Sequence, residues 1–133
     1  YDQFHLYPDV KPTIQRLKQM GLMLGIITGG YEEDMEKILP KVGLQNTFDV
    51  CVGVNTVGRR KPNPQVFHYA LKKLRVKAGE AGFVGDDLMA DYLGAEKAGL
   101  TAVLIRREGS TTSDIRCIKR LEEIFEVLAG ITL

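Results

Sequence analysis

The sequence has few of the features that mark secreted, membrane-spanning or nucleic-acid-binding proteins. Its two cysteines, Cys51 and Cys117, cannot form a disulfide framework, and Cys51 lies in an apolar run that favours a free thiol in a reducing compartment. No apolar run approaches the ~20 residues of a membrane span, and the first residues show no charged-then-apolar signal pattern. The formal net charge of +1 gives no overall attraction to nucleic acid or to anionic membranes. A cytoplasmic location is therefore expected.

Repeats, low-complexity segments and the common nucleotide-binding loops are absent as well. Neither Gly-x-Gly-x-x-Gly nor Gly-x-x-x-x-Gly-Lys-Ser/Thr occurs, so the fingerprints of dinucleotide-binding and P-loop proteins are missing. The composition suits a globular domain, because 44% of the 133 residues are hydrophobic and 26% are charged. A chain of this length is expected to form about one domain.

Apolar strand-like runs alternate with helical patterns along nearly the whole chain. Residues 1–7 form an entry segment. Apolar residues then recur at helical spacing in five stretches, which begin after Asp9, after Gly30, at the cap signal Asn63-Pro64, after Asp87 and at Leu121. The expected strands are 22–27, 48–54, 81–85 and 101–105, with a short strand within 114–118 after a polar loop at 109–113. This alternation predicts an α/β fold with a parallel sheet, right-handed crossovers and helices on both faces.

Three carboxylates follow the strand that ends at Gly85. Asp86 and Asp87 lie where a strand stops and a helix begins, and Asp91 comes four residues later. In an open parallel sheet this is the carboxyl edge, where ligands bind. Adjacent carboxylates repel each other, and a Mg²⁺ ion would remove that repulsion. The alternative is that both acids cap the helix and favour its positive N-terminus.

Other polar residues follow the neighbouring strands and are expected at the same edge. Thr28 could donate to a phosphate oxygen, and Gly29-Gly30 would let backbone N–H groups approach that anion. Lys61 could neutralise a phosphoryl oxygen, while the acids hold a metal that stabilises charge during transfer. Taken together, the three strand ends indicate a site for a phosphoryl group.

Each of these residues also has a purely structural interpretation. Thr28 could simply end its strand, the two glycines could relieve a tight turn, and Lys61 could belong to a solvated basic loop with Arg59 and Arg60. Arg106 and Arg107 end the fourth strand, where they could contact substrate or remain solvated. The joint arrangement favours the functional interpretation.

With these residues the chain resembles the haloacid dehalogenase superfamily, whose members are mostly phosphatases. Leu6-Tyr7-Pro8-Asp9-Val10 resembles the segment that leads from the cap domain back into the core. The motifs that carry the resemblance further are Ile26-Ile27-Thr28-Gly29-Gly30, Lys61-Pro62-Asn63-Pro64-Gln65-Val66-Phe67, and Val84-Gly85-Asp86-Asp87 through Asp91. They match the second, third and fourth motifs of the family in order and at similar spacing.

The resemblance implies a three-layer Rossmann-like parallel sheet and a role for each matching residue. Thr28, with Gly29 and Gly30, would bind the transferring phosphoryl group, and Lys61 would orient and neutralise it. Asp86 would bind Mg²⁺, Asp87 would do so directly or through water, and Asp91 would support the loop. The metal-free dehalogenases of the family tend to lack the acidic pair, so this pair favours a Mg²⁺-dependent phosphatase.

The first motif of the family, an apolar strand ending in Asp-x-Asp, is absent. Asp2 follows no strand, Asp49 precedes one, and Asp34 lies at a helix start. By resemblance that strand is the central one and carries the nucleophile, and the cap domain is missing too. Without the central strand, the strands at Leu22 and Phe83 would have unpaired backbone amides, and each unpaired amide would cost about 1–3 kcal/mol if buried. Residues 1–133 are therefore expected to be part of the core domain, completed by a preceding segment or a partner chain.

The expected function of the complete protein is hydrolysis of a small phosphate monoester through an aspartyl-phosphate intermediate, with this chain alone inactive. A non-catalytic module that binds a partner or a phosphorylated ligand is the main alternative. A phospho-acceptor signalling domain also gathers these residue types at a sheet edge, but the order along this chain, with Thr first, then Lys and then the acids, fits that class poorly. A metal-free dehalogenase is a weaker alternative still.

Overall fold

The computed structural model describes residues 6–109 and 114–131. The entry residues 1–5 and most of the expected polar loop, 110–113, lie outside the described part. The strands are β1 (Gly25–Ile27), β2 (Val50–Val52), β3 (Gly82–Gly85), β4 (Thr101–Ile105) and β5 (Cys117–Ile118). The α-helices are α1 (Val10–Gln19), α2 (Glu32–Lys41), α3 (Val54–Val57), α4 (Pro64–Leu74), α5 (Gly94–Lys97) and α6 (Ile124–Ile131). Within the described residues, no helix is long and apolar enough to cross a membrane.

Shorter helical turns precede three of these elements. They are η1 (Ala78–Glu80), η2 (Leu88–Leu93) and η3 (Leu121–Glu123). The turn η2 is a π-helix that runs directly into α5, so the predicted helix after Asp87 is present but is wider in its first half. Asn63 caps α4 as predicted, because its side chain accepts a hydrogen bond from the Gln65 N–H.

The first two strands are shorter than the sequence predicts. The predicted strand at 22–27 begins only at Gly25, and Leu22 and Met23 are 36% and 50% exposed. The strand is short because its partner β2 pairs with it only from Gly25 opposite Val50 to Ile27 opposite Val52. The one-turn helix α3, which starts within the second predicted strand and runs into the following loop, was not predicted.

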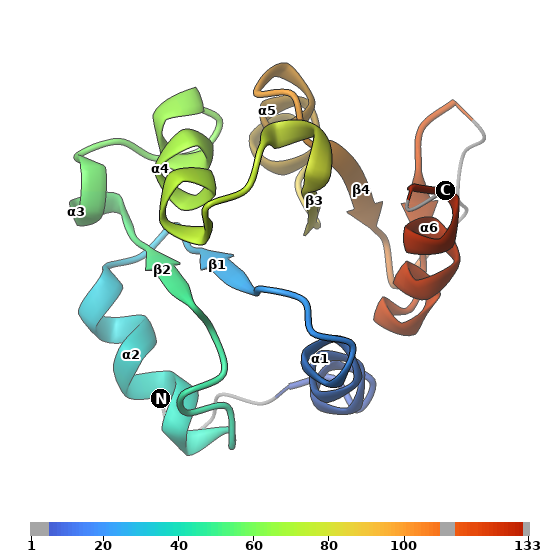
Figure 1. The fold of residues 1–133 in the computed structure, drawn as a ribbon, viewed down its shortest axis with the longest axis horizontal. Coiled ribbons are helices and arrows are strands. Elements are labelled where there is room, and N and C mark those ends of the chain that lie inside the picture. The colour runs from blue at the N-terminus through green and yellow to red at the C-terminus, as the bar shows by residue number, and fades with distance from the viewer. Residues whose placement is uncertain (1–5, 110–113, 132–133) are drawn as a thin grey trace.

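All paired strands are parallel, as predicted, but they form two separate sheets. One sheet holds β1 and β2, and the other has the order β3-β4-β5. Figure 1 shows β1 and β3 as the facing members of the two sheets. Among the described residues no strand lies between them, and they do not pair with each other. The described residues therefore show the expected gap between the strands before Thr28 and Asp86, which are not paired with each other.

Helices cover both faces of the strands, which makes a three-layer arrangement. Along β4, Ala102 and Leu104 belong to the larger core cluster with residues of α4 and α5, whereas Val103 packs on Ile118 and Ile124. Successive side chains of a strand point to opposite faces, so α4–α5 and α6 lie on opposite sides of the sheet. Figure 1 shows α1 on the side away from α4 and α5.

The facing edges of β1 and β3 have unpaired backbone groups. The Thr28 N–H donates to the Val52 carbonyl, so every second residue before it, Ile26 and Leu24, also faces β2. By the same alternation, the Thr101 N–H bond to the Ala81 carbonyl turns the even-numbered residues of β3 away from β4. The residues that turn away from their strand partners are Gly25, Ile27, Gly82 and Val84. These edges are half-exposed or exposed, in contrast to the buried centre of β4.

Side chains hold the two sheets together on both faces. On one face the rings of Phe67 in α4 and Phe83 in β3 meet edge to face, with centroids 5.1 Å apart. On the other face the guanidinium of Arg16 in α1 lies 4.1 Å from the ring centroid of Phe125 in α6. Side-chain contacts therefore connect the two sheets, whereas no backbone hydrogen bond joins β1 to β3.

Candidate active site

The predicted site residues all lie at the carboxyl edge of the parallel strands. Thr28 directly follows β1, Asp86 directly follows β3, and Lys61 lies between β2 and α4. Because paired strands are parallel, these loops emerge at one edge, where open α/β sheets bind ligands. The structure brings Lys61 and Asp91 into direct contact.

The turn after β1 is open where the sequence predicted an anion site. The Gly30 N–H donates to the Thr28 hydroxyl, 3.1 Å away, and Gly29 and Gly30 are exposed. A Cβ built on Gly29 would meet nothing within 4 Å. Neither glycine has a positive φ, so backbone strain does not require glycine here. Strain relief in a tight turn does not explain the two glycines, whereas an open approach to the backbone does.

A hydrogen-bond network ties this turn to the loop after β2. The Val54 N–H donates to the Gly30 carbonyl at 2.9 Å, and the Asn55 side chain accepts from the Glu32 N–H and donates to Glu33. A Cβ on Gly53 would overlap the backbone of Glu32, so glycine is needed for this approach. Sequence reasoning missed Asn55, because nothing in its local pattern shows a partner 22 residues away.

Lys61 is not part of a solvated basic loop. Its side chain is 17% exposed, and its Nζ lies 2.7 Å from the Asp91 Oδ1 and 3.4 Å from the Ile27 carbonyl oxygen. The same ammonium lies 5.8 Å from the centre of the Phe83 ring. Ile27 belongs to β1, Phe83 belongs to β3, and Asp91 follows β3. The Lys61 ammonium therefore lies between the two open edges.

Asp91 is buried beneath the loop that carries the other acids. Its side chain is 5% exposed, and its Oδ2 accepts a hydrogen bond of 3.1 Å from the Asp87 N–H. Oδ1 accepts no further hydrogen bond, so the contact with Lys61 is what compensates its burial. A Cβ on Gly85 would overlap the Asp91 carboxylate, which explains glycine at the strand end. The π turn of η2 holds Asp91 in this inward position.

Asp86 and Asp87 differ in whether helix capping explains them. The Asp87 Oδ1 accepts a hydrogen bond from the Ala90 N–H at 2.8 Å, so this acid does cap the helical turn. Asp86 is exposed and makes no hydrogen bond or ion pair with any described residue. Helix capping therefore accounts for Asp87 but leaves Asp86 without a structural role.

The donors at this edge suit Mg²⁺, although they do not form a full set. Mg²⁺ is usually held by one or two carboxylates together with water and substrate phosphate oxygens. Asp86 and the second oxygen of Asp87 provide such hard oxygen donors, whereas Asp91 is engaged by Lys61. In the described part of the chain, no group of three or more His, Cys, Asp or Glu side chains could hold a metal. Further ligands would have to come from elsewhere.

Arg107 pairs with a carboxylate and is not a solvated charge. Its NH1 atom lies 2.9 Å from the Asp9 Oδ2, and its guanidinium stacks 3.8 Å from the centre of the Tyr7 ring. Asp9 stands at the N-cap position of α1 as predicted, but its carboxylate accepts from Arg107 and the Leu121 N–H rather than from the helix. Burial raises the pKa of Asp9, but these two partners outweigh it and lower the pKa overall. Arg106 is exposed.

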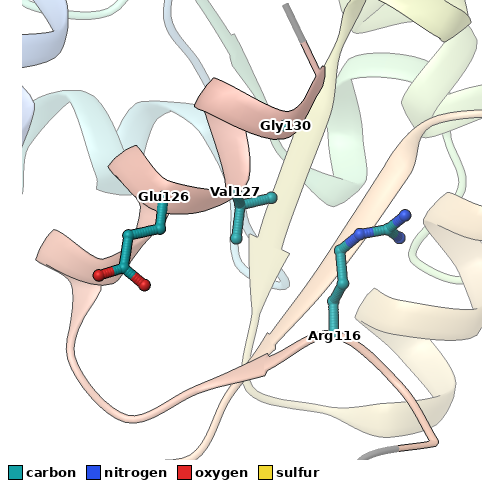
Figure 2. A pocket seen from close by; sticks show the side chains of 4 residues that line it. All are labelled: Arg116, Glu126, Val127 and Gly130. Carbon is teal, nitrogen blue, oxygen red and sulfur yellow. The ribbon is translucent and has the colours of Figure 1, made fainter. Parts of the chain in front are cut away.

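A hollow of about 350 Å³ lies away from these loops, beside α6. It is lined by Arg116, Glu126, Val127 and Gly130, and Figure 2 shows Arg116 across from the helix. Arg116 directly precedes β5, at the amino end of that parallel strand. The hollow therefore lies at the opposite edge of the sheet from the candidate site.

The comparison with known proteins agrees with the geometry. The sequence profile of "Haloacid dehalogenase-like hydrolase" matches residues 1–105. The glyceraldehyde 3-phosphate phosphatase of Methanopyrus kandleri is 42% identical over 101 residues, which cover 76% of this chain and 43% of the relative. The (S)-2-haloacid dehalogenase 4A of Burkholderia cepacia is 30% identical over 110 residues, covering 83% and 47%.

A solved structure extends the match to the fold. The crystal structure of a HAD phosphatase from Thermococcus onnurineus superposes with a TM-score of 0.86 at 38% identity, covering 94% of this chain and 59% of that one. The chain spans about half the length of the curated relatives it matches. The profile match, the fold and the placement of the three motifs agree, and the chain belongs to the haloacid dehalogenase-like hydrolases.

Proposed function

We propose that the complete protein is a Mg²⁺-dependent phosphatase that hydrolyses a small phosphate monoester. The observation that carries this proposal is the position of the Lys61 ammonium, held at 2.7 Å from Asp91 between the open edges of β1 and β3. A cation held there can neutralise a phosphoryl group that approaches the Thr28 turn on one side and Asp86 on the other. A cytoplasmic location, expected from the sequence, is part of the proposal.

The proposal requires a strand that this chain does not supply. The open backbone groups of Gly25, Gly82 and Val84, with the N–H of Ile27, would pair with a parallel strand inserted between the two sheets. A preceding segment of the same polypeptide or a partner chain would provide it, and with it an aspartate at its carboxyl end. Residues 1–133 would then be part of a core domain and inactive by themselves.

The residues of this chain would bind and orient the substrate. The Thr28 hydroxyl and the Gly29 N–H would donate to phosphoryl oxygens, and the Gly30 N–H would join them by exchanging its bond to the Thr28 hydroxyl for a phosphoryl oxygen. Lys61 would neutralise both the phosphoryl group and the nucleophile. The inserted aspartate oxygen bonds to phosphorus while the bond from phosphorus to the leaving oxygen breaks. Water then attacks the aspartyl phosphate and releases inorganic phosphate, which restores the carboxylate.

Asp86 and Asp87 would hold the metal together with ligands from the inserted strand and the substrate. Mg²⁺, when bound, supplies positive charge against the phosphoryl oxygens. Asp91 would act through its neighbours, because it fixes both Lys61 and the Asp87 N–H.

Two other functions remain as alternatives. A metal-free dehalogenase is suggested by the relative from Burkholderia cepacia, but it would leave the exposed carboxylate of Asp86 without use. A non-catalytic module would bind a phosphorylated ligand at the same loops without turning it over. The phosphatase accounts for more of the polar residues at this edge than either alternative.

The first experiment is the intact mass of the protein purified from its native source, together with any polypeptide that accompanies it. A chain containing an apolar strand that ends in Asp-x-Asp supports the proposal. Phosphate release by that complete protein should then depend on Mg²⁺ and fall at least 100-fold in Asp86→Asn. A lone, folded, monomeric 14.8 kDa species would instead favour the binding module.

A further inference from the structure

Three consecutive cations precede α4, and only the last of them has an anionic partner. Lys61 pairs with Asp91, whereas Arg59 and Arg60 are exposed and form no ion pair with any described residue. The only hydrogen bond that Arg59 makes within the described chain is to the Gly58 carbonyl. Both guanidinium groups are therefore available to an anion.

An open hollow of about 420 Å³ is lined by both arginines. Val54, Gly58 and Asn63 complete its lining. The Asn63 side-chain oxygen accepts from the Gln65 N–H, which leaves its amide NH₂ group without a partner among the described residues. The side-chain nitrogen groups at the hollow are therefore hydrogen-bond donors, and those of the two arginines carry charge.

Two residues that line the hollow are linked to the candidate phosphoryl site, one by a hydrogen bond and one along the chain. Val54, which lines it, donates its N–H to the Gly30 carbonyl of the Thr28–Gly30 turn. Arg60, which also lines it, directly precedes Lys61 in the chain.

The loop that carries the hollow is fixed rather than free. Asn55 bonds to Glu32 and Glu33, the Thr56 hydroxyl donates to Glu32 at 2.6 Å, and Asn63 caps α4. Glu32 and Glu33 are occupied by these bonds and do not pair with the arginines.

From this arrangement we infer that Arg59 and Arg60 form a second anion subsite, and that the substrate carries a second acidic group besides the transferred phosphate. The inference rests on the proposed phosphatase function and adds the class of its substrate. A guanidinium binds a carboxylate or a phosphate through paired N–H donors, so either group would satisfy the subsite.

The test uses the complete protein and two matched substrate pairs. One pair is 3-phosphoglycerate against glycerol 3-phosphate, and the other is fructose 1,6-bisphosphate against fructose 6-phosphate. In Arg59→Gln/Arg60→Gln, the ratio of kcat/KM for the doubly acidic member to its partner should fall about tenfold, mainly through KM. The first pair reports a carboxylate subsite and the second a phosphate subsite.

Control variants separate this subsite from general charge effects. Lys72→Gln/Lys97→Gln removes two exposed cations elsewhere and should leave both ratios unchanged. Arg59→Lys/Arg60→Lys keeps the charge and should retain part of the preference. If the wild-type protein prefers neither acidic member, or if the control double variant lowers the ratios equally, the inference is overturned.

Calorimetric binding of the same four compounds keeps the inference testable without turnover. If no compound releases phosphate, the proposed function fails, yet tighter binding of a doubly acidic compound that depends on Arg59 and Arg60 still supports the subsite. Equal affinity for both members of each pair would overturn the subsite even in an active phosphatase.

Discussion

The Lys61 ammonium and the Asp91 carboxylate, 30 residues apart in sequence, lie 2.7 Å apart and join the two sheets at their carboxyl edge. Both side chains are largely buried, so each compensates a charge that is mostly shielded from water. Because Lys61 also contacts the Ile27 carbonyl of β1, this ion pair positions the cation between two strands that share no backbone bond.

Asp91→Asn should lower the free energy of unfolding of the complete protein by about 3–5 kcal/mol, because it leaves a buried lysine without its counter-charge. Denaturant titration measures this change. The matched control is Glu122→Gln, which breaks an exposed pair with Arg120 and should cost less than about 1 kcal/mol. Adding Lys61→Met to Asp91→Asn should recover part of the loss; a further loss of the same size would contradict the role of the pair.

Gly85→Ala should displace Asp91, because the new methyl group would occupy the space of the carboxylate. We expect a loss of about 1–3 kcal/mol in stability from overpacking and a larger relative loss of phosphatase activity. Gly82→Ala is the control in the same strand, since its Cβ would meet only the Thr101 carbonyl oxygen at an ordinary 3.6 Å. Equal effects of the two substitutions would argue against a special position for Asp91.

The ion pair of Asp9 with Arg107 should make stability depend on pH in the acid range. The pKa of Asp9 in the folded protein is lower than its ordinary value of 3.8, so its contribution is present above about pH 4 and is lost as the pH falls through the lowered pKa. Above pH 4, Asp9→Asn should be less stable than wild type by about 1–3 kcal/mol.

Measuring unfolding of both proteins from pH 7 to pH 2 tests this expectation. The difference between wild type and Asp9→Asn should shrink below pH 4, and Arg107→Met should show the same trend. A constant difference over the whole range would mean that the Asp9 carboxylate contributes nothing through its charge.

Cys51 should react slowly with alkylating agents in the native protein. Burial, followed by the charges of Glu32 and Glu36, raises the pKa of the Cys51 thiol from 9.0 to about 11. At pH 8 this lowers the reactive thiolate fraction about 100-fold, and the reaction rate with it. Iodoacetamide labelling followed by mass spectrometry, with the urea-unfolded protein as reference, measures the ratio. Similar rates in the two states would show that β2 does not shield the thiol.

Features that depend on residues close together in the chain follow from the sequence alone. The alternation of apolar runs and helical spacing predicts parallel strands with helices on both faces, and Asn63-Pro64 predicts the start of α4. The order of Thr28, Lys61 and the acids after successive strands predicts one edge, because parallel strands end on the same side. The missing Asp-x-Asp strand also predicts that β1 and β3 do not pair, which the two separate sheets confirm.

Which charges meet depends instead on how the elements pack in three dimensions. Lys61 and Arg107 stand in similar basic runs, yet one binds Asp91 and the other binds Asp9 from 98 residues away. Asp86 and Asp87 are identical neighbours, yet only Asp87 caps the helical turn. Local patterns fix which elements form, whereas ion pairing and burial depend on how those elements pack, and sequence spacing does not encode that distance.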